Sequence, residues 1–207
     1  PKNKEAFLIH LLERLDTHTH LHFQTETTMD TLDYSGTGLN RGSKMVIAAG
    51  RKKRRALRHE PPTDLRLDQC QIPRMVIPGV MVIVAPAWRS QHEAEQQMQH
   101  WAAQLASWGQ DAFSETTTIP FVTFVDEGAI NKDEAFRDWL WVTFTRCNPS
   151  HDIYGVESQT AHKHWGCKGS LLFDARKKSH HAPELLTDGS AEERAESLLR
   201  KYGQSRR

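Results

Sequence analysis

Two histidines, a lysine, a tryptophan and a cysteine crowd into the six residues from His162 to Cys167. Imidazole and thiolate groups bind transition metals, and an imidazole beside an indole can instead orient an aromatic carboxylic acid in a cleft. The spacing HxHxxC matches none of the closed structural zinc patterns. The stretch therefore predicts a loop that presents these side chains to a cleft. A metal site, or a corner in which Trp165 packs into the core and the histidines are solvated, is the alternative.

A second histidine cluster, His18, His20 and His22, alternates along "THTHLHF". Alternate side chains of a strand point to one face, so two of these imidazoles could chelate a metal. No cysteine or carboxylate at helical spacing completes a coordination shell nearby. We expect a polar strand face rather than a metal site.

The acidic pair Asp126-Glu127 follows the apolar run "IPFVTFV" and could supply a general acid or base. Because Lys132, Asp133 and Glu134 come next, a turn that caps a helix explains the pair equally well. The basic run at 51–55 resembles a nucleic-acid patch but lacks interleaved aromatic residues. We expect a solvated connection there, or a phosphate contact in a larger assembly, and no nucleic-acid partner.

The elements that must position these groups alternate between apolar strands and amphipathic helices. Ser90 with Glu93, Asn131 with Glu134, and Ser190 with Glu193 have the capping-box spacing that opens a helix. Glycines at 109 and 203 and the Asn-Pro pair at 148–149 predict helix ends. The expected helices cover about residues 5–15, 90–108, 132–146 and 190–202, and the expected strands about 17–27, 44–50, 80–85, 119–127, 152–156 and 170–175.

This alternation predicts the α/β class, with a three-layer α/β/α architecture and a mixed, mostly parallel sheet. Ligands of such sheets bind beyond the carboxyl ends of the strands. The loops 85–92, 126–134 and 175–183 leave such ends and are the expected walls of a site. The tryptophans of the predicted helices should fill the core, with some left for an interface: Trp101, Trp108, Trp139 and Trp141.

The bulk composition excludes several classes of protein. With 27 basic against 26 acidic residues the net charge is +1, so no strong field draws the chain to nucleic acid or an anionic membrane. There is no apolar run of membrane-spanning length, secretory signal, Walker A motif or GxSxG motif. Three cysteines without a CxxC pair indicate reduced thiols and a cytoplasmic location. Because the sequence does not begin with Met, we expect a piece of a longer protein.

Several motifs, in the expected order, resemble the C-terminal domain of the UbiD-type decarboxylases. The run from "PFVTFVDEG" ends in a TRxxPxxD pattern, and "GCKGSLLFDARKK" resembles the later strand of that domain. Residues 22–50 look like a segment of a longer UbiD-like subgroup. The similarity covers most of residues 18–182, and the matching positions are Thr145, Arg146, Pro149, Asp152, Gly166, Ser170, Asp174 and Ala175.

The resemblance implies non-oxidative decarboxylation of aromatic or α,β-unsaturated carboxylic acids with prenylated FMN and a divalent metal. The Glu–Arg–Glu network of such enzymes belongs to upstream domains that nothing here matches. The chain should therefore bind no cofactor and catalyse nothing alone, and instead line a substrate cleft and contribute to a homodimer. The implied pocket residues are Gln159, Thr160, His162, His164 and Trp165. Arg89 is the nearest cation where relatives often place a flavin-contacting lysine.

We divide the chain into an N-terminal helix, strand and Gly-rich loop segment at 1–60 and a UbiD C-terminal-like α/β domain at 61–207. The expected partners are the upstream flavin-binding domains of the same polypeptide, a second copy and a small aromatic acid. Two alternatives stay open, namely a stand-alone protein that serves assembly or regulation and a small metal-binding protein.

Overall fold

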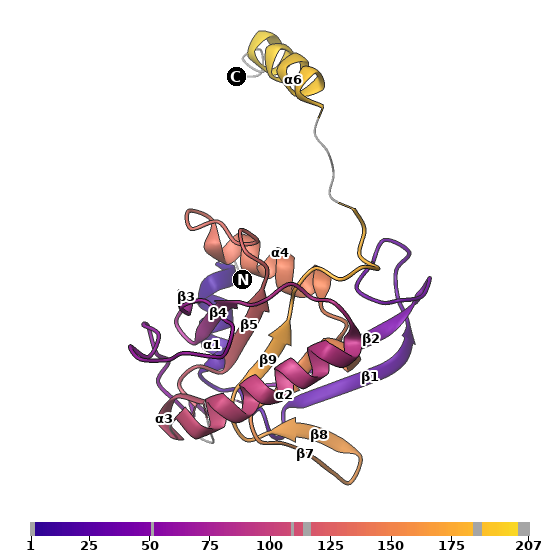
Figure 1. The fold of residues 1–207 in the computed structure, drawn as a ribbon. Helices are drawn as coiled ribbons and strands as arrows, with labels where there is room; N and C mark the ends of the chain where they lie inside the picture. The colour runs from indigo at the N-terminus through magenta and orange to yellow at the C-terminus, as the bar shows by residue number, and fades with distance from the viewer. Residues whose placement is uncertain (1–2, 51, 109, 114–116, 184–187, 203–207) are drawn as a thin grey trace.

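A computed structural model describes residues 3–50, 52–108, 110–113, 117–183 and 188–202 (Figure 1). A central sheet lies between helices, and a two-stranded ribbon stands beside it. The elements are α1 (Lys4–Leu12), β1 (Leu21–Thr28), β2 (Arg41–Ile47), β3 (Arg74–Ile77), β4 (Val80–Val84), α2 (Gln91–Trp108), α3 (Gln110–Phe113), β5 (Phe121–Val125), α4 (Ala135–Arg146), α5 (Pro149–Asp152), β6 (Ile153–Gly155), β7 (Ser158–Ala161), β8 (His164–Cys167), β9 (Leu171–Asp174) and α6 (Gly189–Tyr202).

The central sheet has the strand order β3-β4-β5-β9-β6. Its three middle strands are parallel, with Val80 opposite Phe121 and Phe121 opposite Leu171. The two edge strands, β3 and β6, are antiparallel to their neighbours. The predicted mixed sheet with a parallel centre is confirmed, and the continuous apolar runs follow from burial of both faces.

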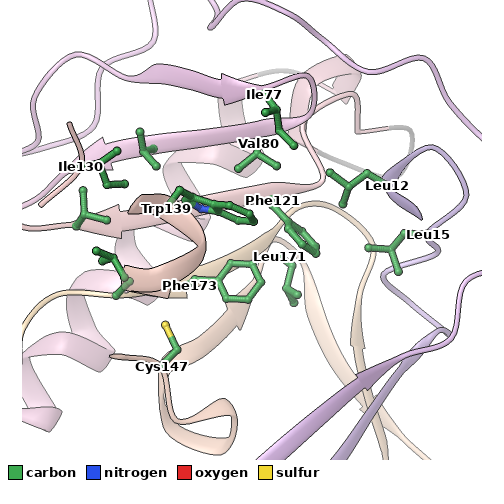
Figure 2. Close-up of a cluster of buried hydrophobic side chains, with 14 of the residues drawn as sticks. Leu12, Leu15, Ile77, Val80, Phe121, Ile130, Trp139, Cys147, Leu171 and Phe173 are labelled. Atoms are coloured by element: carbon green, nitrogen blue, oxygen red, sulfur yellow. The ribbon is translucent and has the colours of Figure 1, made fainter. Parts of the chain in front are cut away.

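Alternate residues of the middle strands supply two separate cores. One face packs against α4, with Trp139 at the centre of a cluster that includes Val80, Phe121 and Phe173 (Figure 2). The opposite face packs against α2 and forms a second cluster, whose members include Met81, Ile83, Met98, Trp101, Leu105, Val122, Phe124 and Leu172. Helices thus cover both faces of the sheet, and the three-layer α/β/α architecture is confirmed.

The N-terminal segment packs on the face that α4 covers. Leu12, Leu15 and Leu21 are fully buried in the cluster around Trp139. The hydroxyl of Ser43 on β2 accepts a hydrogen bond from the backbone N–H of Ser150 (2.8 Å) and also bonds the side chain of Asn148. These contacts join β2 to the α4–α5 turn. A domain boundary at residue 60 stays a prediction.

One of the predicted helix caps agrees with the structure, and the other two differ from it. Ser90 caps α2 as expected, since its hydroxyl accepts the backbone N–H of Glu93 at 3.2 Å. The predicted cap Asn131 instead accepts from the N–H of Asp133 in a turn, and α4 begins three residues later than expected. In α6 the capping carboxylate is that of Asp188, which accepts from the N–H of Ser190. The glycines predicted to end two helices, at 109 and 203, lie outside the described residues.

The four tryptophans of the predicted helices are divided between the core and the surface. Trp101 and Trp139 are buried, whereas Trp108 and Trp141 are exposed. α6 buries none of its residues. Within the described ranges, no helix is both long and apolar enough to cross a membrane.

A matched pair of substitutions tests the packing under α4. The buried Thr123 hydroxyl accepts the indole N–H of Trp139 at 2.9 Å, whereas the buried Thr143 hydroxyl has no hydrogen-bond partner among the described residues. We expect Thr123→Val to lower the free energy of unfolding by about 1–3 kcal/mol, because it leaves the indole N–H unpaired. Thr143→Val, of the same shape, should be neutral or stabilising. Urea unfolding of both variants measures the difference, and equal losses would contradict this assignment.

Candidate functional site

The three loops that follow β4, β5 and β9 line one groove at the carboxyl ends of these strands. We call it the strand-end groove. Its volume is about 840 Å³, and it is lined by Ala87, Trp88, Arg89, Asp126, Glu127, Gly128, Ala129, Arg146, Lys177, Lys178 and Ser179. The loops 85–92, 126–134 and 175–183, expected as walls of a site, thus line one groove, and its role as a site stays a prediction. Parallel register brings them together, because it aligns the carboxyl ends of all three strands.

Asp126 holds two walls of this groove together. Its Oδ2 accepts the backbone N–H of Lys177 at 2.6 Å and a guanidinium N–H of Arg146 at 3.2 Å. The carboxylate thus joins the end of β5 to the end of α4 and to the loop after β9. Asp126 is a structural acceptor in this arrangement, and the exposed carboxylate of its neighbour Glu127 is the one that faces solvent.

A buried ion pair lies at the base of the loop after β9. The guanidinium of Arg176 donates to both carboxylate oxygens of Asp174, at 2.8 and 2.7 Å. It also donates to the Pro86 carbonyl at 2.9 Å and to the Gln97 side chain at 2.6 Å. The same group stacks 5.4 Å above the ring of Trp101 on α2. All three nitrogens of this buried guanidinium therefore donate a hydrogen bond, and one of its faces stacks on an aromatic ring.

Lys178 forms a second buried cation next to the first. Its ammonium donates to the carbonyls of Arg146, Asp174 and Arg176 at 3.0, 2.8 and 3.3 Å, and lies 3.4 Å from Asp152. Burial raises the pKa of the Asp152 carboxyl to about 6, against the opposing pull of the Lys178 charge. Asp152 also accepts the N–H of residue 148 at 2.7 Å, which closes the turn between α4 and α5.

The stretch 158–167 is a β-hairpin, which the sequence did not predict. β7 and β8 pair antiparallel from Ser158–Cys167 to Ala161–His164. His162 and Lys163 form the two-residue turn with φ values of +50° and +65°, the pattern of a type I′ turn. Gln159, Thr160 and His162 are exposed.

The other hairpin side chains pack against the β1 region. A ring nitrogen of His164 lies 3.0 Å from the carbonyl of His18, and the ring of Trp165 meets Phe23 edge to face at 5.3 Å. Cys167 is fully buried, and burial raises the pKa of its thiol to about 12. The thiol is therefore a protonated core group. Among the residues that the structure describes, no cluster of three or more His, Cys, Asp or Glu could hold a metal.

The structure does not bring the five predicted pocket residues to the strand-end groove. β6 runs antiparallel to β9 and ends with Gly155 opposite Leu171, at the start of β9, so the hairpin follows at the opposite end of the parallel strands (Figure 1). Their role in a substrate pocket stays a prediction about a site shared with other domains. Arg89, by contrast, does line the groove; its side chain is 78% exposed and lies 3.8 Å from Glu93.

The histidines at 18–22 are not on one strand face, so that expectation is wrong. Only His22 lies in β1, while His18 and His20 lie in the turn before it. His20 accepts the backbone N–H of Asp16 at 3.0 Å, and the Asp16 carboxylate accepts the N–H of His18. These local hydrogen bonds favour a turn over the extended conformation that the alternating pattern predicts.

A second groove, which sequence reasoning missed, adjoins the first and shares Arg146 and Lys177 with it. We call it the aromatic groove. It runs between the loop after β1 and the outer side of α4 and has a volume of about 710 Å³. It is lined by Asp30, Leu32, Asp33, Tyr34, Trp141, Phe144, Thr145, Arg146, Lys177, His181, Ala182 and Pro183. The sequence signal that could have indicated this groove is the spacing of Trp141 and Phe144, two large aromatic residues on one helix.

The fold and the groove together define an α/β domain with a charged site at the carboxyl ends of parallel strands. Residues 1–49 match the family model of the 3-octaprenyl-4-hydroxybenzoate carboxy-lyase C-terminal domain. A Chlamydia pneumoniae protein, named as one of the subunits of a 4-hydroxybenzoate decarboxylase, is 27% identical over 199 residues, which cover 93% of this chain and 30% of that protein. An uncharacterised Chlamydia trachomatis protein is 25% identical, over 97% of this chain and 32% of that protein. The resemblance to the UbiD-type carboxy-lyases that the motifs indicated is confirmed by these matches.

The chain spans about a third of the length of these curated relatives. Two solved structures are similar in part. A dimeric form of the UbiD-class enzyme HmfF from Pelotomaculum thermopropionicum, in complex with prFMN, covers 60% of this chain and 24% of its own, at a TM-score of 0.37 and 16% identity. Vanillic acid decarboxylase from Sedimentibacter hydroxybenzoicus matches 64% of this chain and 30% of its own chain, with a TM-score of 0.35 and 17% sequence identity.

The raised pKa of Asp152 predicts a pH dependence of stability. The folded state holds this proton more tightly than the unfolded chain, whose carboxyl has a pKa near 3.8. The contribution to stability is therefore complete below that pH and is lost as the pH rises through about 6. We expect a loss on the order of 2 kcal/mol, measured by denaturant unfolding at pH steps.

The control separates Asp152 from the other acids. Carboxylates with lowered pKa values, such as that of Asp16, change stability in the opposite direction with pH, so the wild type alone is not decisive. The decline should be absent from Asp152→Asn and present in Asp188→Asn, which changes an exposed carboxylate. A decline of the same size in both variants would assign it to another group.

Proposed function

We propose that this chain is the C-terminal domain of a UbiD-like non-oxidative decarboxylase of aromatic or α,β-unsaturated carboxylic acids. In this proposal the domain forms one wall of the substrate cleft, contributes to a homodimer and is not catalytic alone. The observation that carries the proposal is the charged groove at the ends of β4, β5 and β9, in a chain related over 93% of its length to a protein named as part of a 4-hydroxybenzoate decarboxylase. Three unpaired thiols are consistent with a cytoplasmic location.

The strand-end groove has the chemistry to hold the anionic end of a flavin. Arg89 places an exposed guanidinium on its rim, and a guanidinium can make paired hydrogen bonds to a phosphate. The indole N–H of Trp88 is buried at the same rim without a hydrogen-bond acceptor among the described residues. These donors fit an anion. Prenylated FMN, when bound, would supply the electron sink for loss of carbon dioxide.

The hairpin β7–β8 is proposed as a wall that closes against a domain outside this chain. Gln159, Thr160 and His162 are exposed on it, and they are hydrogen-bonding groups suited to a carboxylate or a phenolic oxygen, although the Gln159 amide also contacts the ring of His18. His164 and Trp165 stand partly buried behind them and hold the hairpin on the β1 region. The site is thus composite, with the reacting groups expected from the upstream domains.

Membership of a multi-protein assembly is the second candidate function. It is favoured by one observation, that the Chlamydia pneumoniae relative is named as one of several subunits rather than as a whole enzyme. In that case the same groove would face a separate polypeptide. Purification of the complete gene product distinguishes the two, because a self-sufficient enzyme releases carbon dioxide without an added protein.

The cofactor assignment is tested by Arg89→Ala in the complete gene product, co-expressed with a flavin prenyltransferase. Loss of one charge-assisted hydrogen bond of about 1.5–3 kcal/mol weakens binding about 10- to 100-fold, so flavin per polypeptide should fall. Arg137→Ala is the control, because Arg137 is an exposed α4 residue paired with Glu134 and Asp138 and does not line the groove. Flavin absorbance after gel filtration gives the ratio. Equal flavin content in both variants rules out the Arg89 role.

The pocket assignment is tested by kinetics with a panel of aromatic acids. Removal of a substrate-contacting side chain, in His162→Ala or Gln159→Ala, should lower kcat/KM by about 10-fold, since one lost hydrogen bond is worth about 1 kcal/mol or more. Flavin content should stay unchanged. His164→Ala and Trp165→Ala should change the ranking of substrates as the hairpin shifts. Wild-type kinetics in all four variants would show that the hairpin lies outside the pocket.

A further inference from the structure

α6 carries an apolar stripe that no described residue of its own chain covers. Ala195, Leu198, Leu199 and Tyr202 follow the i, i+3, i+4, i+7 spacing that places side chains on one helix face. None of them is buried, and Leu199 is 69% exposed. A helix with an amphipathic face gains most of its stability by burying that face. The stripe is therefore suited to binding a partner surface.

The aromatic groove is an apolar surface of the complementary kind. Trp141 is 71% exposed and Leu32 is 80% exposed, and Tyr34 and Phe144 are also exposed beside them. An exposed cluster of large apolar side chains marks an interaction site, and aromatic residues are enriched at the centres of protein interfaces. The groove lies between a helix and a loop, which suits an inserted helix.

The charges of the two surfaces also match. α6 has Glu192 and Glu193 beside Arg194 in its first half, and Arg200 and Lys201 in its last turn. The aromatic groove has Asp30 and Asp33 on its loop side and Arg146 and Lys177 on its other side. The two glutamates can therefore pair with the cations of the groove, and the two basic residues of the last turn with its aspartates. Such complementarity fixes the orientation of docking.

We propose that the aromatic groove binds α6 of a second copy of this chain. At 1.5 Å per residue the 14 residues of α6 are about 21 Å long, enough to lay the whole stripe along the groove. One copy offers both the helix and the groove and buries neither on itself within the described residues. If each copy places its α6 in the aromatic groove of the other, both apolar surfaces of both copies become buried in a closed two-fold dimer. The inference locates the homodimer contact of the proposed function and rests on that part of it alone.

Two exposed substitutions test the exchange in the 207-residue chain. Trp141→Ala removes the anchor of the groove, and Leu199→Glu places a charge in the apolar stripe. A two-fold dimer carries each substitution twice, so each variant alone should dimerise at least about 30-fold more weakly than the wild type, as expected for a hot-spot residue. An equimolar mixture keeps one intact contact, between α6 of the Trp141 variant and the groove of the Leu199 variant. Mixing should therefore restore a heterodimer.

Analytical ultracentrifugation with two fluorescent labels follows both the single variants and the mixture. Leu39→Glu is the matched control, since Leu39 is 80% exposed and does not line the groove, and its dimer should equal that of the wild type. A dimer that survives both substitutions overturns the inference, and so does a failure of mixing to restore it. A monomeric wild type also overturns it. Hydrogen exchange then distinguishes α6 packed on its own chain, with protected amides, from α6 left uncovered.

The outcome is independent of the decarboxylase test. A complete gene product that releases carbon dioxide while its dimer ignores these substitutions overturns the inference alone. An inactive gene product whose chain shows loss and rescue of the dimer as described overturns the decarboxylase proposal alone.

Discussion

The rest of the structure depends on four buried charges at the base of the loop after β9. Asp174 and Arg176 form one pair and Lys178 and Asp152 the other, and together they carry no net charge. A buried ion that loses its partner costs several kcal/mol, so each donor and acceptor in this set must keep its place. Successive residues of β9 point to alternate sides, and the chain keeps this alternation beyond the strand. The side chains of Asp174, Arg176 and Lys178 are therefore all buried. The residue between the two cations, Lys177, is thereby turned to the groove wall.

This network connects elements that are far apart in sequence. The Lys178 ammonium donates to the carbonyl of Arg146 at the end of α4 and pairs with the carboxylate of Asp152 at the end of α5. The α4–α5 turn in turn holds β2, through Asn148 and Ser43. The loop after β1 and the outer face of α4 are therefore fixed against the strand ends. The two grooves adjoin on this surface and share Arg146 and Lys177.

Sequence reasoning succeeded where one local signal dictates the structure. The apolar run at Val80, the hydroxyl of Ser90 and the parallel-sheet rule placed β4, α2 and the three loops correctly. It failed where contacts distant in sequence decide. The hairpin turn at His162 and Lys163 has positive φ at residue types that give no turn signal, and it is held by packing on the β1 region. No local pattern could pair the loop near Leu32 with α4 across more than 100 residues.

The distribution of satisfied and unsatisfied groups indicates what the domain contributes to a larger site. The four buried charges at the base of the loop after β9 are paired with one another, and their role is to hold the backbone. Two donors that lack an acceptor or a strong partner among the described residues, Trp88 Nε1 and the Arg89 guanidinium, stand together on the rim of the strand-end groove. Two such donors on one rim would offer hydrogen bonds to an anion, as the proposed function requires. An anion held there, and a helix held in the aromatic groove, would meet across the shared residues Arg146 and Lys177, so that assembly and ligand binding act on the same two side chains.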